Sequence, residues 1–387
     1  MPTKFMTKKN LTHTMKKSKL KILTIVGTRP EIIRLSEVIK KLNENFTHKL
    51  IFTNQNFSKE LSEIFFNDLK IQKPDYFFNI QNKSVGQFYG DVLINSEKVF
   101  IKEKPDAIVI LGDTNSCISA LIARRMEIPI FHLEAGNRSF DNNVPEEINR
   151  KIADNISDFN LVYTRYAKLN LLSEGFDKRR IFIIGSPLNE VLNSNQKQIN
   201  KSKILDKLNI TKNKFFLVSL HREENIENIH KLNILISSIL NLQKIYNFKI
   251  VITNHPRFSK KNKELLKNKN IILCKPFGYF DYIKLQKNAY CTISDSGTIA
   301  EESSIANFPA ICLRDSIERP EALDEGSIIL SGVNENSILN SIEMTKKLFK
   351  SPNNCPEDYR IKDTSERVVK LIQGLTGLRD KWLNIEK

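Results

Sequence analysis

Residues 20–42 read LKILTIVGTRPEIIRLSEVIKKL, and this stretch contains the unit from which the rest of the chain is built. Its apolar, β-branched run at 20–26 predicts a strand. Gly27 then allows a tight turn, and the residues from Pro30 to Leu42 predict a helix because their apolar side chains recur along one face. A buried strand that passes directly into an amphipathic helix is typical of a parallel α/β sheet.

The same alternation continues along the chain. Two sets of further strands are predicted, at 49–53, 106–111, 128–133, 159–163 and 180–184, and at 214–220, 248–253, 270–274, 290–294, 309–313 and 327–330. Helices are expected between them, including 85–103 and 114–126. Because the strands are apolar almost throughout, helices should cover both faces of each sheet. We therefore expect an α/β protein with two Rossmann-like, doubly wound domains facing across a cleft, where ligands bind at the carboxyl ends of the strands.

The length of 387 residues suits two domains. We expect a disordered basic leader at 1–19, a first domain at 20–192, a polar linker at 193–202, a second domain at 203–362, and a C-terminal helix within 363–387 that packs back on the first domain. The chain has neither a signal-peptide pattern nor an apolar run of about 18–20 residues. These features predict a cytoplasmic protein without stable membrane insertion.

The net charge of +16 would suit a protein that binds nucleic acid or an acidic membrane. The lysines, however, are scattered along the chain, and seven of them lie in the first 21 residues. A solvated surface is therefore the preferred interpretation, and no nucleic-acid partner is expected. The five cysteines show no CxxC pairing, which favours free thiols in a reducing compartment over a zinc site.

Two helix starts carry residue types that bind phosphate. Gly27–Pro30 follows the first strand, so its amides and the Arg29 guanidinium could hold an anion, with Arg34 about one turn further on. Asp295–Thr298 opens a second such helix, where the Ser296 hydroxyl and the Gly297 amide would seat a diphosphate. Either motif could instead be an ordinary helix start with its cap.

Candidate acidic residues occur in two places, in the helix that follows Asp295–Thr298 and in the segment 111–150. Either Glu301 or Glu302 could reach a ribose hydroxyl from the helix that follows Asp295–Thr298.

Within the segment 111–150, Asp113 and Glu134 each follow an apolar strand, and Glu146 begins a helix with Arg150 one turn later. Such converging carboxylates suit acid–base chemistry and stabilisation of positive charge. Asp113 could alternatively cap a helix that begins at Thr114.

Two further basic positions complete the candidate site. His221 follows the strand FFLVSL and could protonate or bind a departing phosphate, whereas His132 alternates with an apolar neighbour on a buried strand and is interpreted as core. Arg319 is a candidate anion-binding residue. Residues 254–257 (NHPR) end the next strand and could line the same cleft.

Seven motifs occur in a fixed order, namely GTRPEIIR, LGDTNS, HLEAGNR, PEEINRKIAD, HREEN, SDSGTIAEE and RDSIERPEA. In this order they resemble the non-hydrolysing UDP-N-acetylglucosamine 2-epimerases, and the resemblance covers about residues 20–375. The family resemblance implies the GT-B arrangement of two Rossmann-like domains, a homodimer, and a UDP-activated amino sugar as the ligand. It implies no metal ion or nicotinamide cofactor.

The resemblance also assigns roles to residues. The positions that match the family's catalytic residues are Asp113, Glu134, Glu146 and His221. Those that match nucleotide- or phosphate-binding positions are Arg29, Arg34, Arg150, Ser296, Gly297, Glu302 and Arg319, and Tyr282 stands where a contact to uracil is expected. The implied reaction is elimination of UDP to a 2-acetamidoglycal, followed by re-addition with protonation from the opposite face.

Details of the motifs leave the substrate open. GDTNS, EAGNR and TNQNF look more like the branch that inverts C2 of UDP-2-acetamido-2,6-dideoxy-L-talose than the branch acting on UDP-N-acetylglucosamine. Gln55–Asn56 replaces the Gln–His pair often found near an allosteric UDP-sugar site. The alternative functions are a hydrolysing 2-epimerase, a GT-B glycosyltransferase and, more remotely, a basic polyanion-binding protein.

Overall fold

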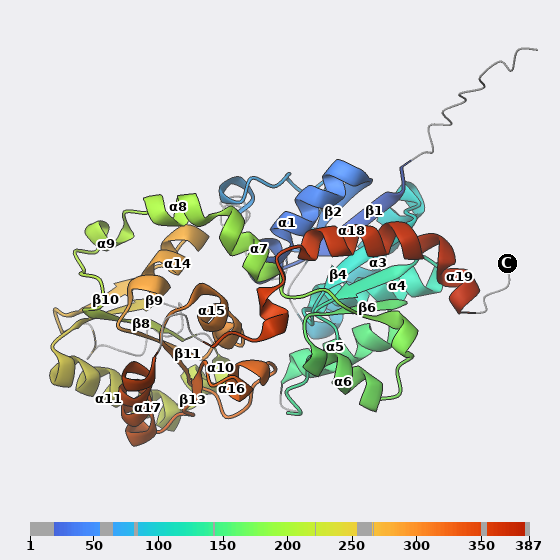
Figure 1. Cartoon of the computed structure of the whole chain (residues 1–387). Helices are drawn as coiled ribbons and strands as arrows, with labels where there is room; N and C mark the ends of the chain where they lie inside the picture. Colours follow the sequence, from blue (N-terminus) through green and yellow to red (C-terminus); the bar gives the residue numbers. More distant parts are fainter. Residues whose placement is uncertain are drawn as a thin grey trace, which may run out of the picture.

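The computed structural model describes residues 19–54, 65–80, 84–141, 144–220, 222–253, 265, 267–349 and 354–383. Within these ranges the chain forms two parallel sheets, each flanked by helices, which lie as separate lobes in Figure 1. The predicted fold class, two Rossmann-like α/β domains, is therefore confirmed. No helix in the described ranges is long and apolar enough to cross a membrane.

The first sheet has the strand order β3-β2-β1-β4-β5-β6-β7. Its strands are β1 (Lys21–Val26), β2 (Thr47–Phe52), β3 (Tyr76–Phe77), β4 (Ala107–Leu111), β5 (Ile130–Leu133), β6 (Phe159–Val162) and β7 (Ile181–Ile183). Its helices are α1 (Arg29–Asn45), α3 (Val85–Glu103), α4 (Ser119–Arg125), α5 (Pro145–Ile156), α6 (Arg165–Ser173) and α7 (Pro187–Ser194), with 3-10 turns η1 (Asn115–Ile118) and η2 (Lys178–Arg180). The order reverses between β1 and β4, which is where such sheets bind ligands.

The second sheet has the order β10-β9-β8-β11-β12-β13. Its strands are β8 (Phe215–Ser219), β9 (Lys249–Thr253), β10 (Ile271–Cys274), β11 (Cys291–Ser294), β12 (Ala310–Cys312) and β13 (Ile329–Leu330). Its helices are α8 (Gln196–Lys201), α9 (Ile204–Lys207), α10 (Glu223–Glu227), α11 (Ile229–Tyr246), α14 (Tyr279–Asn288), α15 (Ile299–Ala306), α16 (Glu321–Asp324) and α17 (Glu335–Leu348). The strand order reverses between β8 and β11. Helix α15 follows β11, and its start lies beside residues of the first domain.

The last segment returns to the first domain. The 3-10 turn η3 (Glu357–Arg360) leads into α18 (Thr364–Leu375), which is followed by η4 (Thr376–Leu378) and α19 (Arg379–Trp382). Helix α18 packs beside α1 and α7 (Figure 1), and the Ser365 amide donates to Glu190 Oε2 at 2.9 Å. Helix α7 also contacts α15, so one apolar core runs from the first domain into the second.

Two stretches differ from the sequence prediction. The predicted helix 114–126 begins as the 3-10 turn η1, where Ser116 is held against Thr53 by a hydroxyl–hydroxyl bond of 2.9 Å, and becomes α-helical at Ser119. The polar stretch 193–202, which was predicted only as a linker, is largely helical, because α7 ends at Ser194 and α8 occupies Gln196–Lys201. The polar composition of this stretch did not predict its helical backbone conformation.

We predict opposite effects on stability for two glycine-to-alanine substitutions. Gly185 has a φ of +81°, and a Cβ there would lie 2.5 Å from Ile361 Cβ, so Gly185→Ala should lower the free energy of unfolding by about 2–4 kcal/mol. Gly374 lies inside α18 with open space around its Cα, so Gly374→Ala should raise the free energy of unfolding by about 0.5–1 kcal/mol. Urea unfolding followed by circular dichroism would measure both, and equal effects would contradict the prediction.

Candidate functional site

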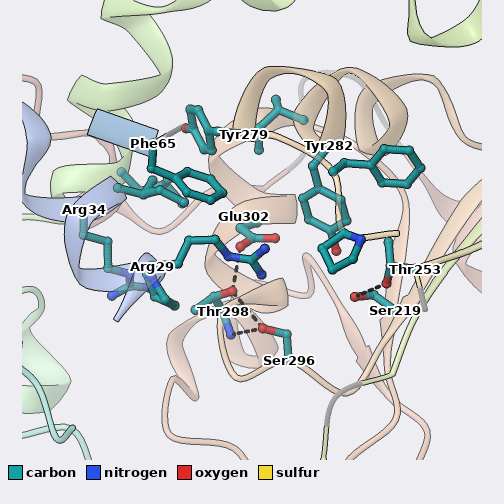
Figure 2. Close-up of a pocket in the computed structure, with 16 residues that line it drawn as sticks. Arg29, Arg34, Phe65, Ser219, Thr253, Tyr279, Tyr282, Ser296, Thr298 and Glu302 are labelled. Atoms are coloured by element: carbon teal, nitrogen blue, oxygen red, sulfur yellow. Dashed lines mark hydrogen bonds between the residues drawn. The ribbon is translucent and has the colours of Figure 1, made fainter. Parts of the chain in front are cut away.

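A cavity of about 320 Å³ lies between the two domains at the starts of α1 and α15. Figure 2 shows its lining side chains, which come from both domains: Arg29, Pro30, Ile33, Arg34, Phe65, Leu188, Ser219, Thr253, Pro276, Phe277, Tyr279, Tyr282, Ile283, Ser296, Thr298 and Glu302. One wall is aromatic and apolar, and the opposite wall carries hydroxyl groups, a carboxylate and guanidinium groups. Such a mixture suits a ligand with both a flat ring and an anionic group.

Arg29 supplies the principal cation of this cavity. It extends from the first turn of α1 across the cavity toward Glu302 (Figure 2), and its guanidinium carbon lies 5.5 Å from the centre of the Phe65 ring. Burial lowers the pKa of Arg29, while the neighbouring Tyr282 and Glu302 raise it. The Tyr279 hydroxyl, buried in the same cavity, has no hydrogen-bond partner among the described residues and is available as a donor.

The start of α15 is ordered by its own side chains. Ser296 Oγ accepts from the Thr298 amide at 3.3 Å, and Thr298 Oγ1 donates to Glu302 Oε1 at 2.6 Å. Gln286 Nε2 donates to the other Glu302 oxygen at 2.6 Å. A Cβ at Gly297 would lie 2.7 Å from Glu318 Oε2 and 2.9 Å from Arg314 Nη1, so a larger residue there would have to displace this ion pair. The start of α15 therefore presents hydroxyl groups to the cavity with Glu302 held one turn behind them.

The start of α1 differs from the sequence expectation. The Glu31 carboxylate is buried and accepts hydrogen bonds from the amides of Gly27 and Thr28, at 3.0 and 2.8 Å. Burial raises the pKa of Glu31 to about 7, although these hydrogen bonds oppose the shift. The two amides that could have held a phosphate are therefore already occupied, and Arg29 is the cationic group that this motif contributes to the cavity.

Four buried charges form a closed ring next to the cavity. Arg34 donates to Glu134 and to Glu301, and Arg319 donates to Glu134 and lies 3.2 Å from Glu301 through its Nε. All four residues are at most 5% exposed. Arg34 and Glu134 belong to the first domain and the other two to the second. Because Arg34 also lines the cavity, it connects the ring with the cavity.

Glu134 sits on a strained main chain. Its φ is +65°, which a non-glycine residue rarely adopts. The turn that contains Glu134 is stabilised by Asp154. Asp154 accepts from the Gly136 amide at 3.2 Å and pairs with Arg138 at 2.7 Å. His132 is fully buried between Gly112 O, at 2.9 Å from Nε2, and Asp154 Oδ1, at 3.0 Å from Nδ1. His132 thus belongs to the core, as expected, and connects the two loops that carry Asp113 and Glu134.

Asp113 and Arg150 meet beside these loops. The Asp113 carboxylate pairs with Arg150 and is not used to cap η1, whose first residue follows Thr114. The Asp113 side chain is 20% exposed, whereas Arg150 is buried. Burial lowers the pKa of Arg150 to about 10, and the nearby Glu318 opposes that shift. Asp113, unlike Glu134, therefore keeps partial access to solvent.

Glu146 is not brought to this cluster in the described structure. It is exposed in the first turn of α5, while Arg150, one turn later, faces inward. The neighbouring Glu147 is buried instead, accepts from the Ser139 amide at 2.9 Å and lies 3.7 Å from Arg150 Nη1. Glu146 and Arg150, four residues apart on one helix face as predicted, therefore differ in burial, and the buried acid beside Arg150 on α5 is Glu147.

Some predicted positions lie outside the described residues, namely His221, Gln55–Asn56 and residues 254–257. Others were missed by sequence reasoning. Tyr163 directly follows β6, and its ring centre lies 5.7 Å from the guanidinium carbon of Arg34. Arg314 pairs with Glu318 at 3.2 Å. Burial by itself would raise the pKa of Glu318, but the charges of Arg314 and of neighbouring arginines lower it to about 2. Residues 313–319 form a loop, so no helical spacing marked this pair in the sequence.

Comparison with known proteins identifies close relatives along nearly the whole chain. A family model described as UDP-N-acetylglucosamine 2-epimerase matches residues 40–373. The UDP-N-acetylglucosamine 2-epimerase of Methanococcus maripaludis is 41% identical over 366 residues, which cover 92% of this chain and 98% of the relative.

Solved structures agree with this comparison. The structure of UDP-N-acetylglucosamine 2-epimerase from Rickettsia bellii matches with a TM-score of 0.88 and 39% identity, covering 95% of this chain and 100% of the other. The Methanocaldococcus jannaschii UDP-GlcNAc 2-epimerase, solved in complex with UDP-GlcNAc and UDP, matches with a TM-score of 0.84 and 37% identity, covering 92% of this chain and 100% of the other.

We predict that the ring tolerates loss of a charge poorly. Glu301→Gln leaves Arg34 and Arg319 to share Glu134 alone, so the free energy of unfolding should fall by about 3–5 kcal/mol. The matched control is Glu302→Gln, one residue along, where only hydrogen bonds to Thr298 and Gln286 weaken and a loss of about 1–2 kcal/mol is expected. Urea unfolding would compare them, and similar losses would contradict a stabilising role for the ring.

Proposed function

This chain belongs to the UDP-N-acetylglucosamine 2-epimerase family, a family of isomerases, and on that premise we propose that it inverts C2 of a UDP-2-acetamido sugar without net hydrolysis. The observation that carries this proposal is the position of Arg34. It lines a cavity whose mixed walls suit a nucleotide and contacts Glu134 in the buried layer behind it. The side chain of Arg34 thus connects the proposed nucleotide site with the acidic group Glu134.

The cavity supports a specific placement of UDP. We assign the diphosphate to Ser296 and Gly297 at the start of α15, with Arg29 approaching from the first domain. Glu302, fixed by Thr298 and Gln286, would accept from a ribose hydroxyl. Uracil would lie against the aromatic wall near Tyr282. Both domains supply groups to one ligand, so binding would hold the domains together.

The chemistry explains why a charged layer is needed beside the nucleotide. The C2 proton is not acidic until the C1–O bond to UDP breaks, because that step gives C1 the character of an oxocarbenium ion. The C1–O electron pair leaves with UDP, a base removes the C2 proton, and a 2-acetamidoglycal results. Re-addition delivers a proton to the opposite face of C2 while a UDP oxygen attacks C1, so atoms and charges balance.

The described residues suggest how these roles divide. Glu134 is fixed between Arg34 and Arg319, so we assign it to electrostatic stabilisation of charge near C1. Asp113, which retains partial access to solvent, is the better candidate for a group that exchanges protons. Glu146 would be the second proton carrier if α5 approaches the bound sugar, and His221 would bind or protonate the departing UDP. Arg150 would hold Asp113 in place.

The homodimer is a further part of the proposal. Three adjacent helices of the first domain, α3, α4 and α5, carry exposed apolar side chains, namely Ile94, Ile101, Leu121, Ile148 and Ile152. Ile94 and Ile101 are seven residues apart and lie on one face of α3. An exposed apolar surface of this kind is typical of a protein–protein interface. We assign it to contact with a second copy of this chain.

Isotope exchange provides the direct test of the reaction. We expect wild-type protein in heavy water to introduce deuterium at C2 of UDP-N-acetylglucosamine or of UDP-2-acetamido-2,6-dideoxy-L-talose, with the UDP linkage retained, as followed by proton NMR. The faster substrate would identify the branch. Release of free sugar and UDP would indicate the hydrolysing reaction, and no exchange from folded protein that binds UDP would favour a glycosyltransferase.

A variant of Asp113 controls for contaminating activity in this experiment. Asp113→Asn should lower the rate of C2 exchange by about 10²–10⁴-fold, because it removes a proton-transfer group, while UDP binding by calorimetry stays within a few fold of wild type. Exchange at the wild-type rate in this variant would contradict the role assigned to Asp113.

The dimer interface can be tested separately. Ile94→Asp places a charge on the apolar surface of α3 and should convert the dimer into monomers in light scattering coupled to size exclusion. Ile245→Asp is the matched control, since Ile245 is similarly exposed on α11 of the second domain and should leave the oligomeric state unchanged. A wild-type protein that is monomeric, or an Ile94 variant that stays dimeric, would contradict the assignment.

A further inference from the structure

Glu31 lies in the first turn of α1, and its carboxylate is enclosed between two loops of the first sheet. Only 1% of the residue is exposed. Oε2 accepts from the amides of Gly27 and Thr28 and from the Thr28 hydroxyl, the last at 2.8 Å. Oε1 accepts from Thr114 Oγ1 at 3.1 Å, so one carboxylate bridges the loop after β1 and the loop after β4.

The surroundings leave little freedom to this arrangement. A Cβ on Gly27 would overlap the hydroxyl oxygens of Ser116 and Thr53, which are themselves hydrogen-bonded to each other at 2.9 Å. The turn after β1 is thus pressed against the loop after β4 and tied to it through Glu31. A displacement of one loop would be transmitted to the other, because no gap remains between them to absorb it.

The two loops carry groups with different proposed tasks. The turn Gly27–Thr28 leads directly into Arg29, which lines the cavity, and Thr114 directly follows Asp113 beside the buried charged layer. Glu31 itself lines neither part of the site. It is therefore placed to set the distance between the cation that would hold the diphosphate and the carboxylate that would exchange the C2 proton.

We propose that Glu31 is a positioning residue of the site assigned above: its carboxylate substitutes for a bound anion at the start of α1 and ties the turn that carries Arg29 to the loop that carries Asp113. The inference rests on the proposed function for its catalytic consequence only. It also explains why the diphosphate is directed to the start of α15, since the equivalent amides of α1 are occupied by the protein's own carboxylate.

The charge of Glu31 gives this role a signature in pH. Burial raises the pKa of Glu31 from 4.5 to about 7. The titratable group that faces Glu31 from η1 is the Cys117 thiol, and burial together with the charge of Glu31 raises the pKa of this thiol above its ordinary value. A pKa raised in the folded state means that the contribution of Glu31 to stability is fully present below pH 4.5 and is lost as pH rises through about 7. Glu31→Gln cannot ionise and should lack this slope.

The deciding experiment replaces the carboxylate and then returns it as a small anion. Glu31→Ala leaves the two amides and two hydroxyls without an acceptor, so we expect UDP affinity to fall about tenfold and the rate of C2 exchange about 100-fold, as for a misplaced catalytic group. Sodium formate should restore part of both quantities, whereas sodium chloride at equal ionic strength should not. Glu37→Ala, on the same helix, where the carboxylate is partly buried and pairs with Lys40, is the matched control and should behave as wild type.

The conservative variant completes the test. In Glu31→Gln the amide oxygen can accept from Gly27 and Thr28, so it should recover most of the UDP affinity that Glu31→Ala loses, and the melting temperature should lose its decrease between pH 4.5 and 7 relative to wild type.

Two results would overturn the proposal. One is a Glu31→Ala variant whose UDP affinity and rate of C2 exchange stay within about twofold of wild type, because a misplaced catalytic group should lower the rate much more. The other is a Glu31→Gln variant with the pH slope of wild type, which decides the matter even if Glu31→Ala does not fold. Wild-type protein that binds UDP without exchanging C2 would contradict the proposed function alone, because UDP affinity and its rescue by formate would still test Glu31.

Discussion

A closed ring of two arginines and two glutamates joins the domains, and the geometry of the site depends on it. Each carboxylate, of Glu134 and of Glu301, contacts both Arg34 and Arg319. Taking four charges out of water is costly, and only their mutual pairing offsets that cost. Each domain contributes one cation and one anion, and two of the four contacts in the ring, Arg34–Glu301 and Arg319–Glu134, cross between the domains. The ring therefore fixes how the two sheets face each other and how wide the cavity between them is.

The strain found in the first domain follows from this requirement. Glu134 reaches the ring from a main-chain conformation that favours glycine, and the surrounding loop is held by Asp154 through Gly136 and Arg138. Strain of this kind persists only where the neighbouring structure enforces it. Buried His132 extends the same support to the loop of Asp113, since it lies between Gly112 O and Asp154. The candidate acidic groups are thus held by buried polar contacts rather than by local helix or strand geometry.

The starts of α1 and α15, which both line the cavity, resemble each other in sequence and differ in chemistry. In α1 the acid three residues after the cap, Glu31, turns back onto the amides and closes them to an outside anion. In α15 the acids point elsewhere: Glu301 turns into the ring, and Glu302 is held by Thr298 and Gln286 at the edge of the cavity. One start therefore contributes the guanidinium of Arg29 to the cavity, and the other contributes the side chains of Ser296 and Thr298.

The sequence by itself determined the two parallel sheets, the order of their strands and helices, and the family, because apolar periodicity and ordered motifs at strand ends are local properties. Tertiary structure alone decided which of two adjacent acids is buried among the charged groups. Neighbours on a helix point about 100° apart, so packing selects buried Glu147 over exposed Glu146 and sends Glu301, not Glu302, into the ring. It also decided that Arg34 and Arg319 pair with Glu134, because contacts between residues 100 and 185 positions apart leave no periodic trace in the sequence.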